Sequence, residues 1–337
     1  MFGFWSSAST CSSLTGKCSN VMAFREQEPA CATRASDPQI FPTVTVVTPS
    51  YNQGRFIRET IESVLSQDYP AVEYMVIDGD STDETVSILK SYGSRISWVS
   101  EPDRGQSEAI NKGWKRATGE IVAWLNSDDI YLPGAISTAV TYLQNHPDVA
   151  LIYGDGFHIS QDGTSLGRFP SEPFSADRLK ETCFIAQPAT FVRRSVIEQV
   201  GFIRDSLRYC MDYDLWIRIS KRYRLQYVPV PLASIRLHND CKTVKDRVAT
   251  YAETVRMLRS NYGYAAPRWS CGYAYRLLDA RLDRSRVWGR VLFTASLPGL
   301  CAWNLVRFSR KAPVREFWRW AIGLRGRYGK LLNEEGS

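Results

Sequence analysis

The stretch Thr43-Val-Thr-Val-Val-Thr-Pro49 is followed without interruption by Ser50-Tyr-Asn-Gln-Gly54. Its first part is a β-branched run that ends in proline, and such a run predicts a buried strand. Its second part consists of turn residues, after which apolar side chains recur at helical spacing from Phe56 to Leu65. A strand, a turn and a helix in this order predict one βα unit.

The same alternation continues along the chain. Residues 73–78, 96–100 and 121–125 predict three further strands, and residues 106–118 predict a helix between the last two. Ser81 and Glu84 match a capping box, which predicts that another helix opens there. Alternating strands and helices predict an α/β fold, a Rossmann-like three-layer α/β/α sandwich with a mainly parallel sheet and helices on both faces.

Composition excludes several classes of protein. The 337 residues are 44% hydrophobic and 23% charged, which argues against a wholly disordered, collagen-like or polytopic membrane chain. The eight cysteines are scattered without a Cys-x-x-Cys pair, and the three histidines lie far apart in the sequence. This pattern predicts a reduced compartment and no structural zinc site.

Composition and charge divide the chain into three segments. Residues 1–41 are rich in Ser, Thr, Ala and Cys and lack the basic and apolar regions of a signal peptide, so we expect a disordered leader. Residues 42–245 are predicted to form the main domain. Residues 246–337 are predicted to form a helical basic appendage, because residues 256–330 hold sixteen Lys or Arg and only three acids.

Polar and mostly acidic groups stand at the end of each predicted strand. Because ligands of such sheets bind outside the carboxyl ends of the strands, these groups predict a site. Carboxylates gathered at one edge repel one another, and a divalent cation or the donors of a ligand would offset that cost. Each cluster alone also fits a helix cap or a turn. The sequence contains neither the Gly-x-Gly-x-x-Gly dinucleotide fingerprint nor a phosphate-binding loop.

From about residue 43 to residue 243, these motifs and their order resemble the family 2 glycosyltransferases, the inverting enzymes of the GT-A fold that use nucleotide sugars. The resemblance implies that the first loop lies against the nucleotide and that the acid ending the second strand binds the base or ribose. It also implies that Asp103, after the third strand, lies on the base or ribose side, with Arg104 and Lys112 nearby. The implied nucleotide-sugar-binding residues are Pro49, Ser50, Tyr51, Asn52, Asp78, Asp80, Asp103, Lys112, Asn126 and Asp128.

The resemblance further implies a divalent metal, Mg2+ or Mn2+, that bridges the diphosphate. Asp128 and Asp129 are the implied ligands, and His238 is a candidate for the metal or the diphosphate. A cation held by carboxylates would neutralise the leaving group as the glycosidic bond breaks. Asn126 stands where the family often has Asp, and Asp80 stands where it has Gly; these two departures predict weaker metal binding and an altered loop.

Inversion requires a base for the acceptor hydroxyl. Asp212 is the implied base and Asp214 is its rival, both at the start of a predicted helix, where the helix dipole favours an ionised carboxylate. The family often has Glu before this Asp, and here Met211 stands there. Gln187, Asp214 and Trp216 are implied on the acceptor side, although Trp216 also lies in an apolar segment typical of a core.

The basic appendage carries aromatic residues interleaved with arginine over residues 286–330. This pattern predicts either peripheral contact with an anionic membrane or helices packed on the main domain with a solvated Arg face. No nucleic acid partner is expected, because the aromatics follow no RNA-binding motif. We therefore expect a cytoplasmic enzyme, with the inner face of the cell membrane as the alternative location.

Together these features predict an inverting glycosyltransferase that moves a sugar from a nucleotide-diphosphate sugar, with UDP the default, to a hydroxyl of a saccharide or lipid-linked acceptor. The expected role is the synthesis of a surface polysaccharide or glycolipid. The alternatives are a non-catalytic scaffold that binds the nucleotide sugar or the acceptor, and a sugar nucleotidyltransferase.

Overall fold

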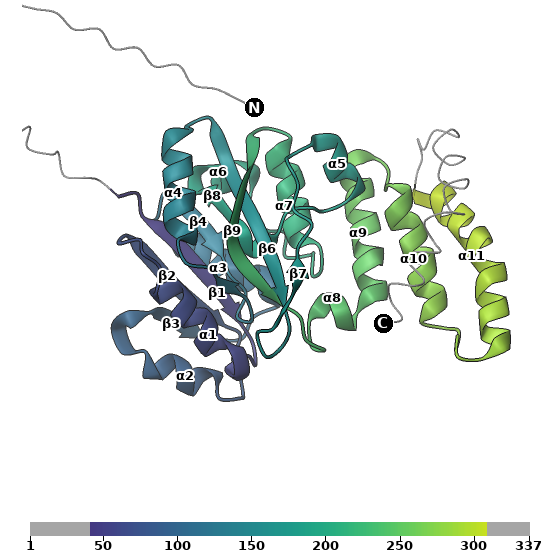
Figure 1. Ribbon diagram of the computed structural model, residues 1–337, viewed down its shortest axis with the longest axis horizontal. Helices are drawn as coiled ribbons and strands as arrows, with labels where there is room; N and C mark the ends of the chain where they lie inside the picture. Colours follow the sequence, from purple (N-terminus) through teal and green to yellow (C-terminus); the bar gives the residue numbers. More distant parts are fainter. Residues whose placement is uncertain (1–40, 309–337) are drawn as a thin grey trace, which may run out of the picture. The chain divides into compact units, whose positions relative to one another are not determined.

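The computed structural model describes residues 41–308. The predictions for the leader at residues 1–40 and for the aromatic and basic segment at residues 309–330 concern residues outside this range. Within it, every strand and helix predicted between residues 43 and 125 is present (Figure 1). The chain begins with β1 (Val44–Ser50), α1 (Gly54–Leu65), β2 (Val72–Asp78), α2 (Thr85–Ser91), the 3-10 turn η1 (Gly93–Arg95), β3 (Ser97–Ser100), α3 (Gln106–Arg116) and β4 (Ile121–Trp124).

The first four strands form the parallel part of the sheet. They lie in the order β3-β2-β1-β4, and each neighbouring pair runs parallel. Their register places Ser50 beside Asp78 and Asp78 beside Ser100, so the carboxyl ends of three strands meet at one edge. The prediction that the polar strand ends line up is therefore confirmed for these strands.

Beyond β4 antiparallel strands join the predicted parallel ones, so the sheet is mixed in this half. β8 (Thr190–Arg193) runs antiparallel to both β4 and β6 (Val149–Ile159), whereas the long β9 (Arg224–Arg236) runs parallel to β6. The short β5 (Ile130–Tyr131) and β7 (Ser165–Arg168) pair antiparallel with β9 and β6. This half of the sheet matters for function, because β9 ends beside the loop that follows β4.

Two hydrophobic cores lie on the two faces of the sheet and make a three-layer sandwich. Successive strand residues point to opposite faces, so Val46 joins one core and Val47 the other. The first core holds side chains of α1, α2 and α4 (Ala135–Asn145). The second holds side chains of α3, α5 (Ala176–Glu181), α6 (Arg194–Val200) and α7 (Met211–Ser220). The predicted α/β/α architecture is confirmed.

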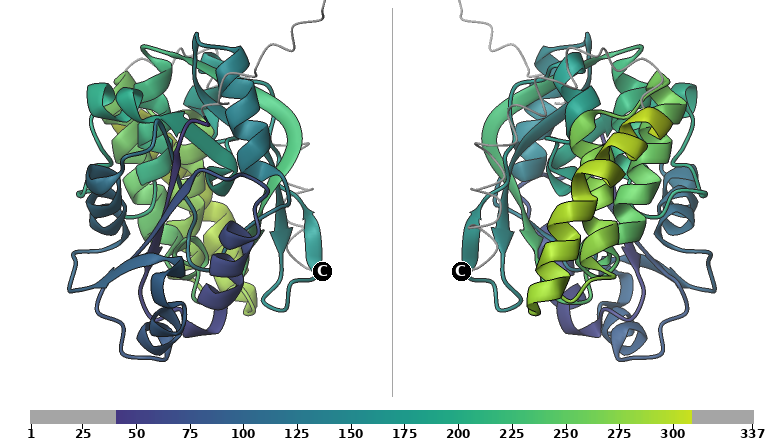
Figure 2. Two further views of the ribbon diagram at one scale, coloured as in Figure 1. Left: turned by 90° about the vertical axis from the view of Figure 1, so that its left-hand side faces the viewer. Right: turned by 90° about the vertical axis from the view of Figure 1, so that its right-hand side faces the viewer.

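The C-terminal region of the described chain is helical, as predicted. It comprises α8 (Lys242–Lys245), α9 (Arg247–Tyr262), α10 (Pro267–Asp279) and α11 (Val287–Phe308). Figures 1 and 2 show α9, α10 and α11 side by side, with α9 nearest to α7. Val255 and Leu258 of α9 belong to the same core as Leu215 and Trp216 of α7. The division at residue 245 stays a prediction.

Candidate active site

The loops after β1 and β2 interlock at the edge of the sheet. The backbone N–H of Asn52 donates to Oγ of Ser81 at 2.7 Å, and Oδ1 of Asn52 accepts from the N–H of Thr82 at 2.9 Å. Asn52 and Asp80 both have a left-handed backbone, with φ of 52° and 66°. Asp80 therefore keeps the conformation that a glycine favours at this position. Tyr51 remains 61% exposed, so this loop offers an aromatic surface to a ligand.

Two predictions about the first two strands need correction. Asp78 is completely buried, and its carboxylate accepts hydrogen bonds from Ser81 and from Oγ of Ser100. It therefore holds the two loops together and offers no surface for the predicted direct contact with a nucleotide. Ser81 does not cap α2, because its hydroxyl donates to Asp78 and α2 begins after Glu84 without a side-chain cap. Pro49 and Ser50 are buried as well.

The loop after β3 brings Asp103 against the loop after β2. A Cβ atom at Gly79 would lie 2.9 Å from Oδ2 of Asp103, so a larger residue there would displace the Asp103 carboxylate. Asp103 is partly exposed, and its Oδ1 accepts from the N–H of Gly105. Lys112 is not free to face a ligand in this arrangement, because its ammonium pairs with Glu101 at 3.0 Å and Glu108 at 3.6 Å.

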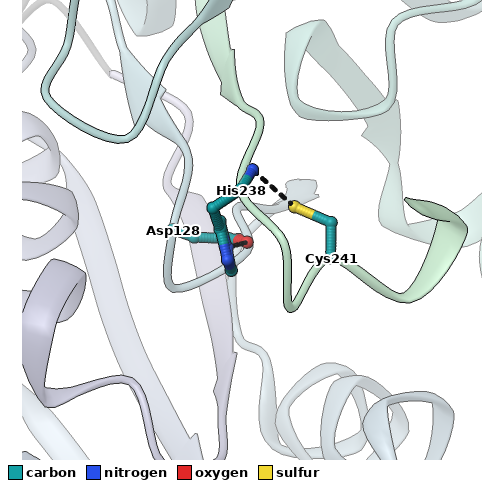
Figure 3. Close-up of side chains that lie close together, drawn as sticks. All are labelled: Asp128, His238 and Cys241. Atoms are coloured by element: carbon teal, nitrogen blue, oxygen red, sulfur yellow. Dashed lines mark hydrogen bonds and ion pairs between the residues drawn. The ribbon is translucent and has the colours of Figure 1, made fainter. Parts of the chain in front are cut away.

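A carboxylate, an imidazole and a thiol converge where the loop after β4 meets the end of β9 (Figure 3). Nε2 of His238 lies 3.0 Å from Oδ2 of Asp128, and the ligand atoms of Asp128, His238 and Cys241 all lie within 4.8 Å of one another. Cys241 was not among the predicted residues, although it lies three residues after His238, a spacing that is a usable signal. The thiol is engaged by the backbone of His238 and Arg236.

Asp129 lies behind the cluster of Asp128, His238 and Cys241 and is not part of it, which corrects its predicted role as a metal ligand. It is 3% exposed; its Oδ1 accepts from the backbone N–H of Arg236, and its Oδ2 accepts from Asn126. Burial, followed by the charge of Asp128, raises the pKa of Asp129 well above its usual value. Asp129 therefore joins the loop after β4 to β9 and supports Asp128.

A chain of side-chain hydrogen bonds crosses the site. Nζ of Lys242 donates to Gln106 at 2.8 Å, and Nε2 of Gln106 donates to Oδ1 of Asn126 at 2.6 Å. Nδ2 of Asn126 donates to Gln187 at 3.1 Å, and Gln187 in turn donates to the carbonyl of Trp124. The amide oxygen of Asn126 is thus already in use. Gln187 lies in the 3-10 turn η2 (Gln187–Ala189) and is partly exposed.

The charges around Lys242 show that it lies among the acids of the site. Burial, followed by the charge of Arg208, lowers the pKa of the Lys242 ammonium, and the carboxylates of Asp128 and Asp103 oppose that shift. Lys242 is therefore a cation close enough to Asp128 and Asp103 to feel both charges.

The start of α3 connects this chain to Asp212. Gln106 belongs to the hydrogen-bond chain, and the next residue, Ser107, donates from Oγ to the carbonyl of Leu207 at 2.8 Å and contacts Sδ of Met211 at 2.9 Å. Asp212 follows Met211 as the second residue of α7, which confirms its predicted place at a helix start. The loop after β4 and the segment before Asp212 are thus held by two adjacent residues.

Asp212 is half-buried, and its Oδ1 accepts from the backbone N–H of Tyr213 at 2.7 Å. Burial raises the pKa of Asp212 to about 6; the backbone hydrogen bonds oppose this shift and the charge of Glu253 adds to it. A carboxylate with that pKa is ionised at neutral pH and basic enough to accept a proton from a hydroxyl as it reacts.

The two remaining acceptor-side predictions are wrong. Asp214 is fully buried, and its carboxylate accepts from Arg204, Arg218 and Asn261 at 2.8 to 2.9 Å. Trp216 is also fully buried and stacks on Trp124 with ring centroids 5.6 Å apart. Neither side chain can reach an acceptor, so both support the core beneath α7, and Asp214 is removed as the rival base.

A profile of the family described as Glycosyl transferase family 2 matches residues 45–201. The putative teichuronic acid biosynthesis glycosyltransferase TuaG of Bacillus subtilis is 34% identical over 208 residues, which cover 59% of this chain and 81% of TuaG. The uncharacterized glycosyltransferase RP339 of Rickettsia prowazekii is 30% identical over 205 residues, or 58% of this chain and 64% of RP339. The chain thus spans just under two thirds of the first curated relatives it matches.

Solved structures share the fold. TarS of S. aureus (residues 1–349), in complex with UDP-GlcNAc, aligns with a TM-score of 0.54 at 17% identity, covering 70% of this chain and 71% of that one. The mannosyltransferase PcManGT of Pyrobaculum calidifontis, in complex with GDP-Man and Mn2+, aligns with a TM-score of 0.53 at 20% identity, covering 86% and 81%. These neighbours confirm the predicted GT-A fold.

Proposed function

The chain belongs to glycosyl transferase family 2, and from this premise we propose that it transfers a sugar, with inversion, from a nucleoside diphosphate to a hydroxyl of a saccharide or lipid-linked acceptor. The observation that supports the proposal best is the bridge at the start of α3. Gln106 and Ser107 hold the segments of Asp128, Lys242 and Asp212 together, so one donor could meet all three.

The nucleoside binds at the loops after the parallel strands. The exposed ring of Tyr51 and the polar groups of Asn52, Asp80 and Asp103 line this part of the edge. Tyr51 offers a face on which a base can stack, and the carboxylate of Asp103 can accept from a ribose hydroxyl. Lys242 supplies positive charge for the diphosphate, because it lies among Asp128, Asp103 and Arg208.

Asp128 and His238 fit a divalent cation. A carboxylate and an imidazole within hydrogen-bond distance are a donor set suited to Mn2+, whereas Mg2+ prefers oxygen ligands alone. A cation held there would neutralise the charge that develops on the diphosphate as the sugar leaves. We assign the metal to these two residues and assign Asp129 to their support.

Asp212 acts as the general base. It takes the proton from the acceptor hydroxyl as the oxygen attacks the anomeric carbon, on the face opposite the diphosphate. The residue is only half-buried, and its pKa of about 6 keeps it ionised at neutral pH. Gln187, joined to Asn126, is the polar group that we place on the acceptor side.

The comparisons support the finer assignments without deciding between donors. One structural neighbour holds UDP-GlcNAc and the other holds GDP-Man with Mn2+, so both bases are candidates, with UDP first. The name of TuaG connects that relative with teichuronic acid synthesis and supports a role in making a surface polysaccharide.

The first test is the binding of UDP, GDP and dTDP to the full chain by calorimetry, each with Mn2+ and with EDTA. We expect one nucleotide to bind in Mn2+ and to lose at least about tenfold in affinity in EDTA, because the diphosphate loses its bridging cation. The matching donor is then incubated with candidate acceptors, and NMR of the product identifies the anomeric configuration. A folded protein that binds none of the three nucleotides would support the scaffold alternative instead.

α11 provides the predicted contact with the inner face of the cell membrane. By length and composition it is the one helix within residues 41–308 that could cross a membrane. One face of α11 packs on α10 through Cys301 and Leu305, so lipid cannot surround the helix while this contact holds. Its other face exposes apolar side chains next to basic ones, which favours a position along an anionic surface. The exposed large apolar and basic residues of α11 are Val287, Trp288, Arg290, Val291, Leu292, Trp303, Val306 and Arg307, and Arg286 is exposed just before the helix.

Sedimentation with vesicles tests this contact. The full chain should bind vesicles that contain phosphatidylglycerol more tightly than vesicles of phosphatidylcholine alone, and added salt should weaken the binding. Replacing both Trp288 and Trp303 with Ser should reduce the bound fraction without changing nucleotide binding. Equal binding by the variant and the native chain would show that this face of α11 does not contact lipid.

A further inference from the structure

Three backbone N–H groups of the loop before α7 converge on one carboxylate. Oε1 of Glu253 accepts from the N–H of Tyr209 at 2.7 Å and from those of Arg208 and Cys210 at 3.0 Å each. Oε2 of Glu253 also accepts from Arg208 at 3.0 Å. Glu253 lies in the middle of α9, more than forty residues after the loop it binds. The side chain thus binds the loop that leads into α7 from another helix.

A carboxylate suits this position for two reasons. The first N–H groups of a helix have no partner within the helix, and Cys210 at the N-cap of α7 forms no side-chain cap hydrogen bond of its own. A negative charge at a helix N-terminus is also stabilised by the helix dipole, and hydrogen bonds to a charged acceptor are stronger than neutral ones. Glu253 therefore fixes the backbone immediately before Asp212.

The loop is held at two further points. The hydroxyl of Tyr209 donates to Oδ2 of Asp246, just before α9, at 2.6 Å. On the opposite side, Ser107 of α3 bonds the carbonyl of Leu207. The loop is therefore bound to α3 on one side and to α9 and the residue before it on the other. These hydrogen bonds leave the loop little freedom to shift.

α9 is packed firmly against α7, so the carboxylate of Glu253 is held in one position relative to the loop. Val255 and Leu258 are completely buried in the core shared with α7. Nδ2 of Asn261 donates to Asp214 of α7 at 2.9 Å, and Lys221 after α7 donates to the carbonyl of Asn261 at 2.9 Å. Asn261, near the end of α9, thus ties this helix to α7, and Glu253 in the middle of α9 binds the loop before Asp212.

We propose that Glu253 is a positioning residue for sugar transfer: by binding the amides of residues 208–210 it holds Asp212 where its carboxylate meets the acceptor hydroxyl. This inference rests on the proposed role of Asp212 as the base. It extends the catalytic unit into α9, beyond the residues that the family profile matches. Glu253 itself touches neither donor nor acceptor in this role.

Three substitutions separate positioning from mere stability. Glu253→Ala removes every acceptor, Glu253→Asp keeps the charge but is one methylene too short, and Glu253→Gln keeps an oxygen that can accept from the amides. Arg256→Ala, an exposed residue on the same helix, is the matched control. The assay is release of UDP from UDP-GlcNAc, or of GDP from GDP-Man if the binding panel selects GDP, in Mn2+ with acceptor.

We expect Glu253→Ala and Glu253→Asp to lower kcat by about 10- to 100-fold, because a displacement of about 1 Å in a catalytic group has that effect. The KM for the donor and the affinity for the nucleotide with Mn2+ should change less than about twofold, since Glu253 contacts none of the side chains proposed to bind the donor. Glu253→Gln should recover most of kcat. Hydrogen exchange of the peptide that contains residues 208–213 should speed up in Glu253→Ala and remain slow in Arg256→Ala.

Asp212→Asn, measured in the same assay, separates the two ways of failing. If Asp212→Asn keeps full turnover, the base assignment fails and the inference falls with it. If Asp212→Asn loses turnover while Glu253→Asp, shown to be folded, matches Arg256→Ala in kcat, only the inference is overturned. If Glu253→Ala does not fold, Glu253→Asp and Glu253→Gln decide the outcome by the same comparison.

Discussion

Nε2 of His238 lies 3.0 Å from Oδ2 of Asp128, although the two residues are 110 positions apart in the chain. The pair joins the loop after β4 to the end of β9. Asp129 strengthens the same junction, because it accepts from the backbone N–H of Arg236 in β9. The proposed metal ligands are therefore brought together by the late strand of the sheet, and each should be needed for the metal.

His238→Ala and Asp128→Ala should each weaken Mn2+-dependent binding of the nucleotide by at least about tenfold, since each removes a ligand of the proposed cation. Calorimetry in Mn2+ and in EDTA measures the effect, and the loss should vanish in EDTA. Asp177→Ala changes an exposed surface acid and serves as the control. Full Mn2+ dependence in both variants would remove the metal assignment.

Asp212→Asn should lower kcat by about 10²- to 10⁴-fold, the usual contribution of a general base, and leave nucleotide affinity unchanged. Asp214→Asn provides a contrast on the same helix. Its buried carboxylate pairs with Arg204 and Arg218, so we expect a loss of about 3–5 kcal/mol in stability as the main effect. Chemical denaturation together with steady-state kinetics distinguishes the two variants.

The pH dependence of turnover should report the ionisation of Asp212. Its pKa is raised by burial to about 6, and only the ionised form can accept a proton. kcat at saturating donor should therefore fall about tenfold per pH unit below pH 6 and level off above it. A profile that stays flat down to pH 5 would assign the base to another group.

Asp80 tests the backbone of the loop after β2. Because its φ is 66°, a glycine fits the position without strain and an alanine does not. We expect Asp80→Gly to be more stable than Asp80→Ala by about 1 kcal/mol in chemical denaturation. Equal stability of the two variants would mean that the loop adopts a different backbone in solution.

The parallel half of the fold could be predicted because its information is local. The β-branched run before Pro49 and the helical spacing after Gly54 define one unit, and the same signals repeat as far as β4. The antiparallel β8 could not be predicted in this way, because it joins β4 and β6 across long stretches of chain and its four residues carry no alternating pattern.

Some of the predicted site residues lie at the site and others are buried, and the difference again depends on contacts that are distant in the sequence. Position at a predicted strand end pointed to Asp128, and the family resemblance pointed to His238 and Asp212. They could not show that Asp78, Asp129 and Asp214 have their oxygens engaged from within the protein, because the partners lie on other elements. The contacts of Glu253 were hidden likewise, since a lone Glu in a helix gives no sign of a loop more than forty residues earlier.

The capture of residues 208–210 by α9 also sets the order in which activity arises during synthesis. The chain leaves the ribosome from its N-terminus, and its domains fold as they emerge. When β9 and α8 have just emerged from the ribosome, the nascent chain already exposes Asp128, His238 and Lys242. Glu253 is then still inside the exit tunnel. Under the proposed roles, such a chain carries the donor-side residues before it gains the side chain that holds the loop before Asp212.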